Sequence, residues 1–293
     1  MLMVIYMSLG VCLAGGGVKG AAHIGALKAM EENNIKIDCI SGTSSGSIVA
    51  MLYAVGYSSN EIKNIFTENA KKIKYIDFKN ICNIIKRLIV EHKFIIEGFN
   101  TGQIIENIIN IYCLKKGIQN IRDIERNILI ASVSLNTGKV LFFESIKKEY
   151  RYSDETVHIK NVNVGKAVRA SCSFPGVFCP CKINDDILID GGVRENIPWK
   201  EIKKIGIDKV LCITFEENKK YKKDKNIVDV ITNSINLMSK ELSNYELDGT
   251  DYLLKIYTKE VSLLDSKEID YLYEQGYNQT KEYLKNFINN KNI

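Results

Sequence analysis

The stretch SGTSSGSIVA, Ser41–Ala50, links a short apolar segment, KIDCIS, to a segment of helical spacing, SIVAMLYAVG. Gly42 and Gly46 stand two residues before and two residues after Ser44. A serine presented on a sharp strand-to-helix turn brings the flanking chain into close contact, and glycine avoids the clash that a side chain would cause there. The pattern predicts that Ser44 is a nucleophile. A helix N-cap is the alternative, because serine and threonine are also common at that position.

A second strand–glycine–helix unit comes just before this turn. The apolar run VIYMSLGVCLA is followed by GGGVKG and then by AAHIGALKAMEENN, whose apolar spacing is helical. Gly15, Gly17 and Gly20 match the dinucleotide-binding pattern GxGxxG, but the end of the next strand carries Ser44 instead of the acidic residue that this pattern expects. The N–H groups of such a loop can also stabilise a developing oxyanion. The candidate oxyanion loop comprises Gly15, Gly16, Gly17, Val18, Lys19 and Gly20.

The remaining segments complete an α/β pattern. Repeated strand–loop–helix units predict a largely parallel central sheet covered by helices on both faces. Residues 58–120 have helical spacing and are expected to form a lid-like insertion. The segments NILIASVSL and KVLFFES predict one hairpin, CKINDDILIDGG predicts a second, and 219–293 predicts a helical extension with one strand, DYLLKIY. We expect a single α/β domain over 1–293 with its core at about 9–215.

Composition bounds the class of protein. The 293 residues are 45% hydrophobic and 26% charged, as in an ordinary globular domain. The apolar start of the chain lacks the basic region of a signal peptide, and no uncharged apolar run is long enough to predict a spanning helix. We therefore expect a cytoplasmic protein with reduced cysteines. The spacing of Cys172, Cys179 and Cys181 matches no standard zinc pattern, and neither a metal nor another cofactor is expected.

The formal charge of +5 is concentrated in residues 71–93, which hold seven basic and two acidic residues. Within this segment Ile81, Ile84, Ile85, Leu88 and Ile89 form one helical stripe, and the basic residues Lys79, Lys86 and Arg87 fall opposite it. One interpretation is a lid helix packed on the core. The other is an interfacial helix over 79–93 that binds the anionic inner surface of a membrane. No nucleic-acid partner is expected, and the oligomeric state is not predicted.

The base that would activate Ser44 is the remaining question. The three histidines, His23, His92 and His158, do not stand at the end of a predicted core strand. Asp190 does, because it ends ILID and is followed by Gly191 and Gly192. A carboxylate at the carboxyl end of a buried strand lies where open α/β sheets build their sites, although aspartate before glycine is also common in turns. Asp190 is therefore the candidate base, acting directly on Ser44.

The motifs GGGVKG, GTSSG and DGG, in this order, resemble the patatin-like phospholipases, which are serine acyl hydrolases with a Ser–Asp dyad. The phrases RASCSFPGVF and LIDGGVRENIP add to the resemblance, which covers roughly residues 11–198. It implies Ser44 as nucleophile, Asp190 as general base and the N–H groups of Gly16, Gly17 and Val18 as oxyanion donors.

The implied substrate is a phospholipid or another lipid ester, hydrolysed through an acyl-enzyme without a cofactor. Ser45 departs from the family, which often has alanine there. A nucleotide-binding oxidoreductase and a catalytically silent lipid-binding protein remain as alternatives.

Overall fold

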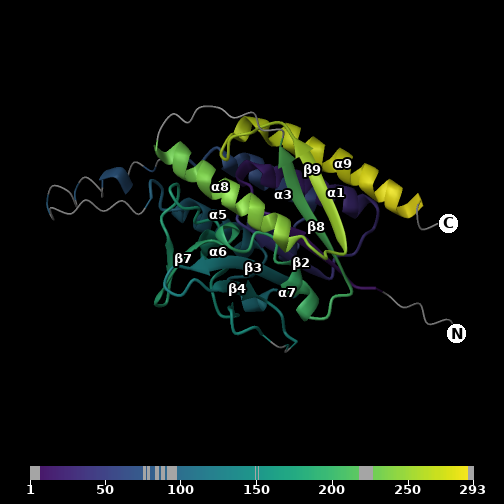
Figure 1. Cartoon of the computed structure of the whole chain (residues 1–293), viewed down its shortest axis with the longest axis horizontal. Helices are drawn as coiled ribbons and strands as arrows, with labels where there is room; N and C mark the ends of the chain where they lie inside the picture. The colour runs from purple at the N-terminus through teal and green to yellow at the C-terminus, as the bar shows by residue number, and fades with distance from the viewer. Residues whose placement is uncertain are drawn as a thin grey trace.

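The computed structural model describes residues 7–74, 77, 80–82, 86, 90, 98–148, 150, 152–217 and 227–289. Their strands form one sheet with the order β5-β4-β3-β2-β1-β8-β9, and a hairpin of two further strands joins it at β3 (Figure 1). The strands of the main path are β1 (Leu9–Leu13), β2 (Cys39–Thr43), β3 (Asn127–Ser134), β4 (Val140–Glu144), β5 (Thr156–Ile159), β8 (Lys209–Glu217) and β9 (Tyr252–Thr258). The hairpin consists of β6 (Cys181–Ile183) and β7 (Asp186–Asp190).

The centre of the sheet is parallel, as predicted. β1 pairs in parallel with β2 and β8, β2 pairs in parallel with β3, and β8 pairs in parallel with β9. Both predicted hairpins are also present, since β3–β4 and β6–β7 are antiparallel. β5, which the sequence did not clearly predict, adds a parallel strand next to β4.

Helices cover both faces of the sheet. Successive side chains of a central strand point to opposite faces, and they are buried on both. Val11 and Leu13 of β1 belong to the larger apolar cluster, and Cys12 belongs to the smaller one on the opposite face. The larger cluster includes residues of α1 (Gly20–Glu32), α2 (Ser45–Ala54), α3 (Ser59–Ala70), α5 (Gln103–Lys115), α6 (Val164–Ser171) and α9 (Ile269–Asn289). The smaller cluster includes residues of α7 (Trp199–Lys204). The predicted α/β architecture is confirmed.

The C-terminal segment is part of this architecture. β9 extends the sheet beside β8, and α9 packs on α1 (Figure 1). The two helices approach to backbone contact, because a side chain at Gly25 would overlap the Tyr273 carbonyl and one at Gly276 would overlap the Ala22 carbonyl. Residues far apart in sequence therefore close the larger core.

The predicted helical insertion at 58–120 contains α3 and α5. Most of the basic segment 79–93, including Lys79, Arg87 and four of its five apolar stripe residues, lies outside the described residues, so its amphipathic helix stays a prediction. Among the helices that the structure describes, none combines the length and the apolar character needed to cross a bilayer.

Candidate active site

Ser44 occupies a strained turn between β2 and α2. Its φ of 52° is rare for a residue with a side chain, and its own N–H donates a hydrogen bond to Ser171 Oγ at 2.9 Å. A side chain at Gly42 would overlap the carbonyl of Gly46, and one at Gly46 would overlap the carbonyl of Leu13. Ser44 makes no side-chain cap of α2, so its hydroxyl is not used as an N-cap. The tight strand–turn–helix geometry that the glycine spacing predicted is present.

Asp190 lies beside this turn because β2 and β7 pair with consecutive parts of the same edge of β3. Thr43, the last residue of β2, pairs with Ala131 of β3. The next residue of β3, Ser132, pairs with Asp190, the last residue of β7. Asp190 ends a buried strand, as predicted, and β7 runs antiparallel to β3. The carboxyl ends of β2 and β7 therefore face each other, and Ser44 and Asp190 meet where the two strands end.

The Asp190 carboxyl group is buried with one oxygen engaged. Oδ1 accepts a hydrogen bond from the Gly192 N–H at 2.8 Å, while Oδ2 is buried without a hydrogen-bond partner among the described residues. Burial raises the pKa of Asp190 to about 7, and interactions with the Ser44 hydroxyl and the Gly192 N–H oppose that rise. The Ser44 hydroxyl and the Asp190 carboxyl group therefore interact, but no hydrogen bond of regular geometry joins them among the described contacts. A carboxyl group with such a pKa can exchange a proton near neutral pH.

The glycine-rich loop lies directly beside Ser44. A Cβ placed on Gly15 would stand 3.0 Å from the Ser44 Cβ. The Val18 N–H donates to the Leu263 carbonyl at 2.7 Å, and Lys19 forms an ion pair with Glu217 of β8 at 3.1 Å. Among the described residues, the N–H groups of Gly16 and Gly17 have no acceptor. Of the three expected oxyanion donors, two are free and that of Val18 is engaged.

Two side chains hold the peptide group that begins this loop. The Ala14 carbonyl accepts a hydrogen bond from His23 Nε2 at 2.8 Å, and the Gly15 N–H donates to Asn196 Oδ1 at 2.8 Å. His23 is fully buried, and burial lowers its pKa to about 4, so its imidazole is neutral at pH 7. Asn196 lies on the loop after Asp190 and its amide donates to Ser243 Oγ at 3.2 Å. The peptide group between Ala14 and Gly15 is therefore held at its carbonyl and at its N–H, which fixes the orientation of the start of the loop.

One cavity of about 930 Å³ contains Ser44, Asp190 and the glycine-rich loop. Part of its lining comes from α2, α3 and α5 and is apolar. These residues are Ile48, Leu52, Ile65, Phe66, Ile105 and Ile109. Another part comes from β8, β9 and α8 (Ile227–Glu246) and carries charged and amide groups. These residues include Glu216, Asn233, Asn236, Lys240 and Lys255. A ligand with an apolar chain and a polar group matches this division.

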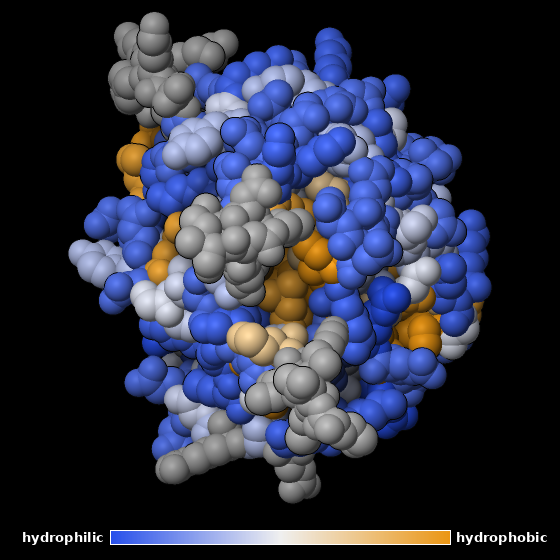
Figure 2. Space-filling view, turned by 90° about the vertical axis from the view of Figure 1, so that its right-hand side faces the viewer, coloured by the Kyte–Doolittle hydropathy of each residue, from blue (hydrophilic) through white to orange (hydrophobic). Residues whose placement is uncertain are grey.

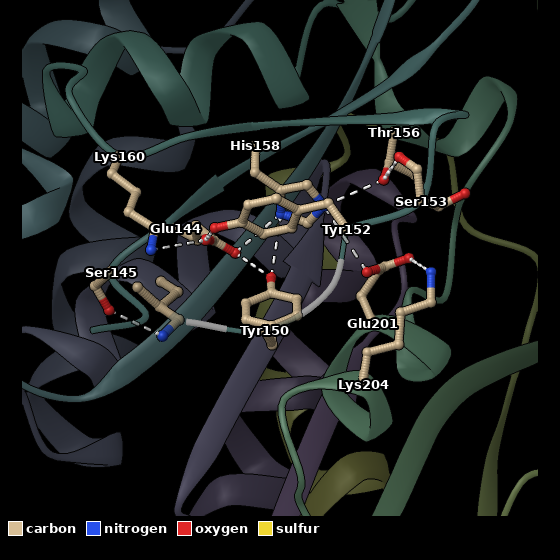
Figure 3. Close-up of polar contacts among 11 residues, drawn as sticks. Glu144, Ser145, Tyr150, Tyr152, Ser153, Thr156, His158, Lys160, Glu201 and Lys204 are labelled. Carbon is tan, nitrogen blue, oxygen red and sulfur yellow. Dashed lines mark hydrogen bonds and ion pairs between the residues drawn. The ribbon is translucent and has the colours of Figure 1, made fainter. Parts of the chain in front are cut away.

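The histidines do not complete a Ser–His pair in the described part of the chain. His158 belongs to a separate buried network at the β4–β5 edge, where its Nδ1 lies 3.1 Å from Glu144 Oε2 (Figure 3). Tyr150 also donates to Glu144 at 2.5 Å, and Tyr152 stacks on the imidazole with ring centroids 4.1 Å apart. Burial raises the pKa of Glu144, but hydrogen bonds from His158 and Tyr150 outweigh burial and leave the pKa below its usual value. His92 lies outside the described residues.

The three clustered cysteines form no metal site in the structure as described. Cys172 and Cys181 are buried thiols and Cys179 is partly buried. Within the described ranges, no three His, Cys, Asp or Glu side chains gather in a way that could hold a metal ion.

Sequence reasoning did not single out Asn196, His23 or Leu263 as parts of this site. Asn196 follows the DGG motif by only a few residues, which is a signal that could have drawn attention to it. Leu263 carries no local signal, because its role rests on a backbone carbonyl that approaches the glycine-rich loop from 245 positions further along the chain. Such contacts follow from chain topology and leave no pattern in nearby residues.

Comparisons with known proteins agree with this fold. Residues 11–202 match the family described as patatin-like phospholipase, which is well over half of the chain. The chain therefore belongs to the patatin-like phospholipase family. This membership replaces the dinucleotide-binding interpretation of the glycine-rich loop.

Individual relatives differ in how much of their length is shared. The uncharacterized protein YqhO of Bacillus subtilis is 30% identical over 73% of this chain and 73% of its own. Lysophospholipase NTE1 of Meyerozyma guilliermondii is 26% identical over 70% of this chain, but the match spans only 12% of NTE1. The structure of the ExoU–SpcU complex of Pseudomonas aeruginosa covers 96% of this chain and 51% of the matched chain, with a TM-score of 0.52 and 20% identity. This last likeness is one of fold.

Proposed function

We propose that this protein hydrolyses carboxylic esters of lipids, with Ser44 as nucleophile and Asp190 as general base. The observation that carries the proposal is the register of β3, which brings the last residues of β2 and β7 to neighbouring positions. The strained turn exposes the Ser44 hydroxyl to the same cavity that Asp190 lines. A nucleophile and a base in one cavity are the minimum that acyl transfer requires.

The proposed reaction proceeds in two steps. Ser44 Oγ attacks the acyl carbonyl carbon while Asp190 accepts the hydroxyl proton, and the carbonyl oxygen becomes the oxyanion of a tetrahedral intermediate. Asp190 then returns the proton to the leaving alcohol as the ester bond breaks, which leaves an acyl group on Ser44. Asp190 then takes a proton from water as the water oxygen attacks this acyl-enzyme, and it returns the proton to Ser44 Oγ as the Ser44 ester bond breaks and the fatty acid leaves.

The N–H groups of Gly16 and Gly17, which have no acceptor among the residues that the structure describes, are the proposed oxyanion donors. They lie in the loop beside Ser44, next to a short helical turn whose positive end also favours negative charge. Val18 would add a third donor only if the Leu263 carbonyl moved away from it. The proposed hole therefore differs from the sequence expectation, in which Val18 was an equal partner.

The proposed substrate is a lipid with an acyl chain and a polar group. The apolar lining from α2, α3 and α5 suits the acyl chain, and the charged lining from β8, β9 and α8 suits the polar group. The name lysophospholipase of a relative that shares this region supports a phospholipid or lysophospholipid.

A serine-reactive fluorophosphonate tests the proposal directly. We expect one covalent label, mapped to the peptide that contains Ser44, and loss of both labelling and ester hydrolysis in Ser44→Ala. Ser45→Ala is the matched control, because Ser45 carries the neighbouring hydroxyl and is the first residue of α2. A label on another serine would refute the assignment of Ser44. A folded protein that is neither labelled nor active would favour the catalytically silent alternative.

A further inference from the structure

Helix α8 does not bury its apolar side against the core, as amphipathic helices on globular proteins usually do. Its polar side faces the catalytic cavity, which is lined by Thr232, Asn233, Asn236, Ser239, Lys240 and Ser243. Its apolar side faces solvent. Leu237 is 70% exposed, Met238 60% and Tyr245 69%, and Val230, Ile231 and Leu242 are exposed as well. An ordinary surface helix would bury such a side against the core.

The exposed apolar residues of α8 form one continuous stripe. At 100° per residue, the positions 230, 231, 234, 237, 238, 241, 242 and 245 fall on one side of the helix. Ser234 donates to the Val230 carbonyl, and Glu241 is the single acidic or basic residue of this outer stripe. α8 lies along the front of the molecule (Figure 1), and Figure 2 shows hydrophobic surface at the margin on that side, in addition to a central hollow and a patch at the lower right.

Polar contacts hold α8 in this orientation. Ser239 Oγ donates to the Gly192 carbonyl at 2.5 Å, and Ser243 Oγ accepts from the Asn196 amide at 3.2 Å. At the end of the helix, the Glu246 carboxylate accepts the N–H groups of Asn196 and Ile197 at 3.1 and 3.0 Å. The inner side of α8 is therefore committed to the loop that follows Asp190, and turning the helix to bury its apolar stripe would break these bonds.

We infer that the outer stripe of α8, residues 230–245, docks this protein onto the surface of a lipid bilayer beside the catalytic cavity. The inference rests on the proposed lipid hydrolysis for its choice of partner. The helix has one side in the cavity that would receive the lipid and the other side exposed and apolar, so a bilayer that covers the stripe lies one helix width from the cavity. Because a lone acidic residue accompanies six apolar ones, the attraction is hydrophobic and does not require anionic lipid.

This mode of binding differs from the one predicted for the basic segment 79–93. Attraction of that segment to anionic lipid should weaken as salt is added. Docking through α8 should persist at high salt and on phosphatidylcholine, which carries no net charge. The two mechanisms are therefore separable with one protein and two vesicle compositions.

The test measures sedimentation with phosphatidylcholine vesicles in a Ser44→Ala background, so that binding does not depend on turnover. We expect the Ser44→Ala protein to bind at low and at high salt, and Leu237→Gln, Met238→Gln and Leu242→Gln combined to lower its partition at least about tenfold. The matched control is Ile111→Gln with Leu114→Gln on α5, which removes two equally accessible apolar side chains, each 55% exposed. This control should bind like its parent.

A second readout uses the active protein. The triple variant should hydrolyse a soluble short-chain ester within about twofold of the parent rate, because the outer stripe does not line the cavity, and should lose activity on vesicles. If the unaltered protein did not hydrolyse the soluble ester, the proposed function would be refuted. The result of the vesicle-binding test would still stand, because that test is made in the Ser44→Ala background and does not depend on turnover.

Three outcomes would overturn the inference. One is equal vesicle binding by the triple variant and its parent. Another is binding that needs anionic lipid and disappears with salt, which would assign it to the basic segment. The last is a parent that is dimeric by light scattering, becomes monomeric in the triple variant and ignores vesicles, which would make a second copy of the chain the occupant of the stripe.

Discussion

Thr43 and Asp190 pair with consecutive residues of β3, Ala131 and Ser132, although they are 147 positions apart in the sequence. β4 occupies the other edge of β3 over the same residues, so β2 and β7 share the remaining edge end to end. The position of the proposed base relative to the proposed nucleophile is thus set by the backbone register of one strand. Because a register shift would turn every side chain of β7 to the opposite face, this placement is strongly specified.

Asp190→Asn should remove nearly all activity while the fold is retained. The amide keeps an oxygen that can accept the Gly192 N–H, but it cannot take the proton of Ser44. We expect kcat to fall by about a thousandfold or more, the scale observed when a member of a catalytic triad is removed. Asp185→Asn, at the exposed tip of the same hairpin, is the control and should retain full activity. An Asp190→Asn variant with more than a tenth of parent activity would exclude Asp190 as the base.

The pH dependence of the reaction should follow Asp190. Its pKa is raised to about 7 by burial, and only the deprotonated carboxylate can act as base. We therefore expect kcat/KM to rise with pH through about 7 and to fall roughly tenfold per pH unit below it. A profile that is flat from about pH 5 to about pH 8 would contradict this assignment.

The stability of the fold should also depend on the ionisation of Asp190, but it should decrease as pH rises. The folded state holds the Asp190 proton up to about pH 7, whereas the unfolded chain releases it near its ordinary pKa of 3.8. The contribution of Asp190 to the free energy of unfolding therefore decreases as pH rises between these two values. Asp190→Asn should be more stable than the parent at about pH 8, by roughly 1–3 kcal/mol, and should lose this advantage near pH 4. Denaturant melts at both pH values measure the difference.

Asn196→Ala should lower kcat with little change in KM. The substitution leaves the Gly15 N–H without its acceptor and frees the start of the oxyanion loop. Misplacement of such a loop by about 1 Å typically costs about a hundredfold in rate, and substrate binding in the apolar part of the cavity should be unaffected. Ser243→Ala removes the other partner of the same side chain and should cost no more than about threefold. An equal loss in the two variants would indicate a general structural effect.

Gly17→Ala should abolish turnover without unfolding the protein. Gly17 has a φ of +62°, and a side chain there would overlap the Leu263 carbonyl, so the loop and its N–H groups must shift. Loss of one oxyanion donor typically lowers kcat by about 10²–10³. Gly56→Ala is the matched control, because Gly56 also has a positive φ, of +95°, but its added methyl group would meet nothing within 4 Å. Unchanged kcat in a folded Gly17→Ala variant would exclude the loop as an oxyanion hole.

His158→Ala should affect stability and spare catalysis. The substitution removes one hydrogen-bond partner of the buried Glu144 carboxylate, at 3.1 Å, and leaves the hydrogen bonds from Tyr150 and Tyr152 (Figure 3). Loss of one hydrogen bond to a buried charged group costs about 1.5–3 kcal/mol in the free energy of unfolding. Activity on a soluble ester, measured well below the melting temperature, should stay within about twofold of the parent. A hundredfold loss of kcat with unchanged stability would instead point to a Ser–His mechanism.

The sequence by itself determined the local parts of the site. Gly42 and Gly46 predicted the turn at Ser44 because the reason for glycine there is steric and acts within a few residues. The end of ILID predicted that Asp190 closes a buried strand, and short turn sequences between apolar segments predicted both hairpins. These features depend on backbone conformation and near neighbours, which short patterns record.

Only the tertiary structure decided how these parts meet. The antiparallel direction of β7, the bond from Gly15 to Asn196 and the approach of Leu263 to Val18 join residues that are far apart in the chain. The sequence of α8 shows an amphipathic helix, but its periodicity is the same whichever side faces the protein. The side that faces the protein was decided by hydrogen bonds between α8 and the loop after Asp190, in which Ser239 donates to the Gly192 carbonyl and Ser243 accepts from the Asn196 amide. A pattern of hydrophobicity does not contain these contacts.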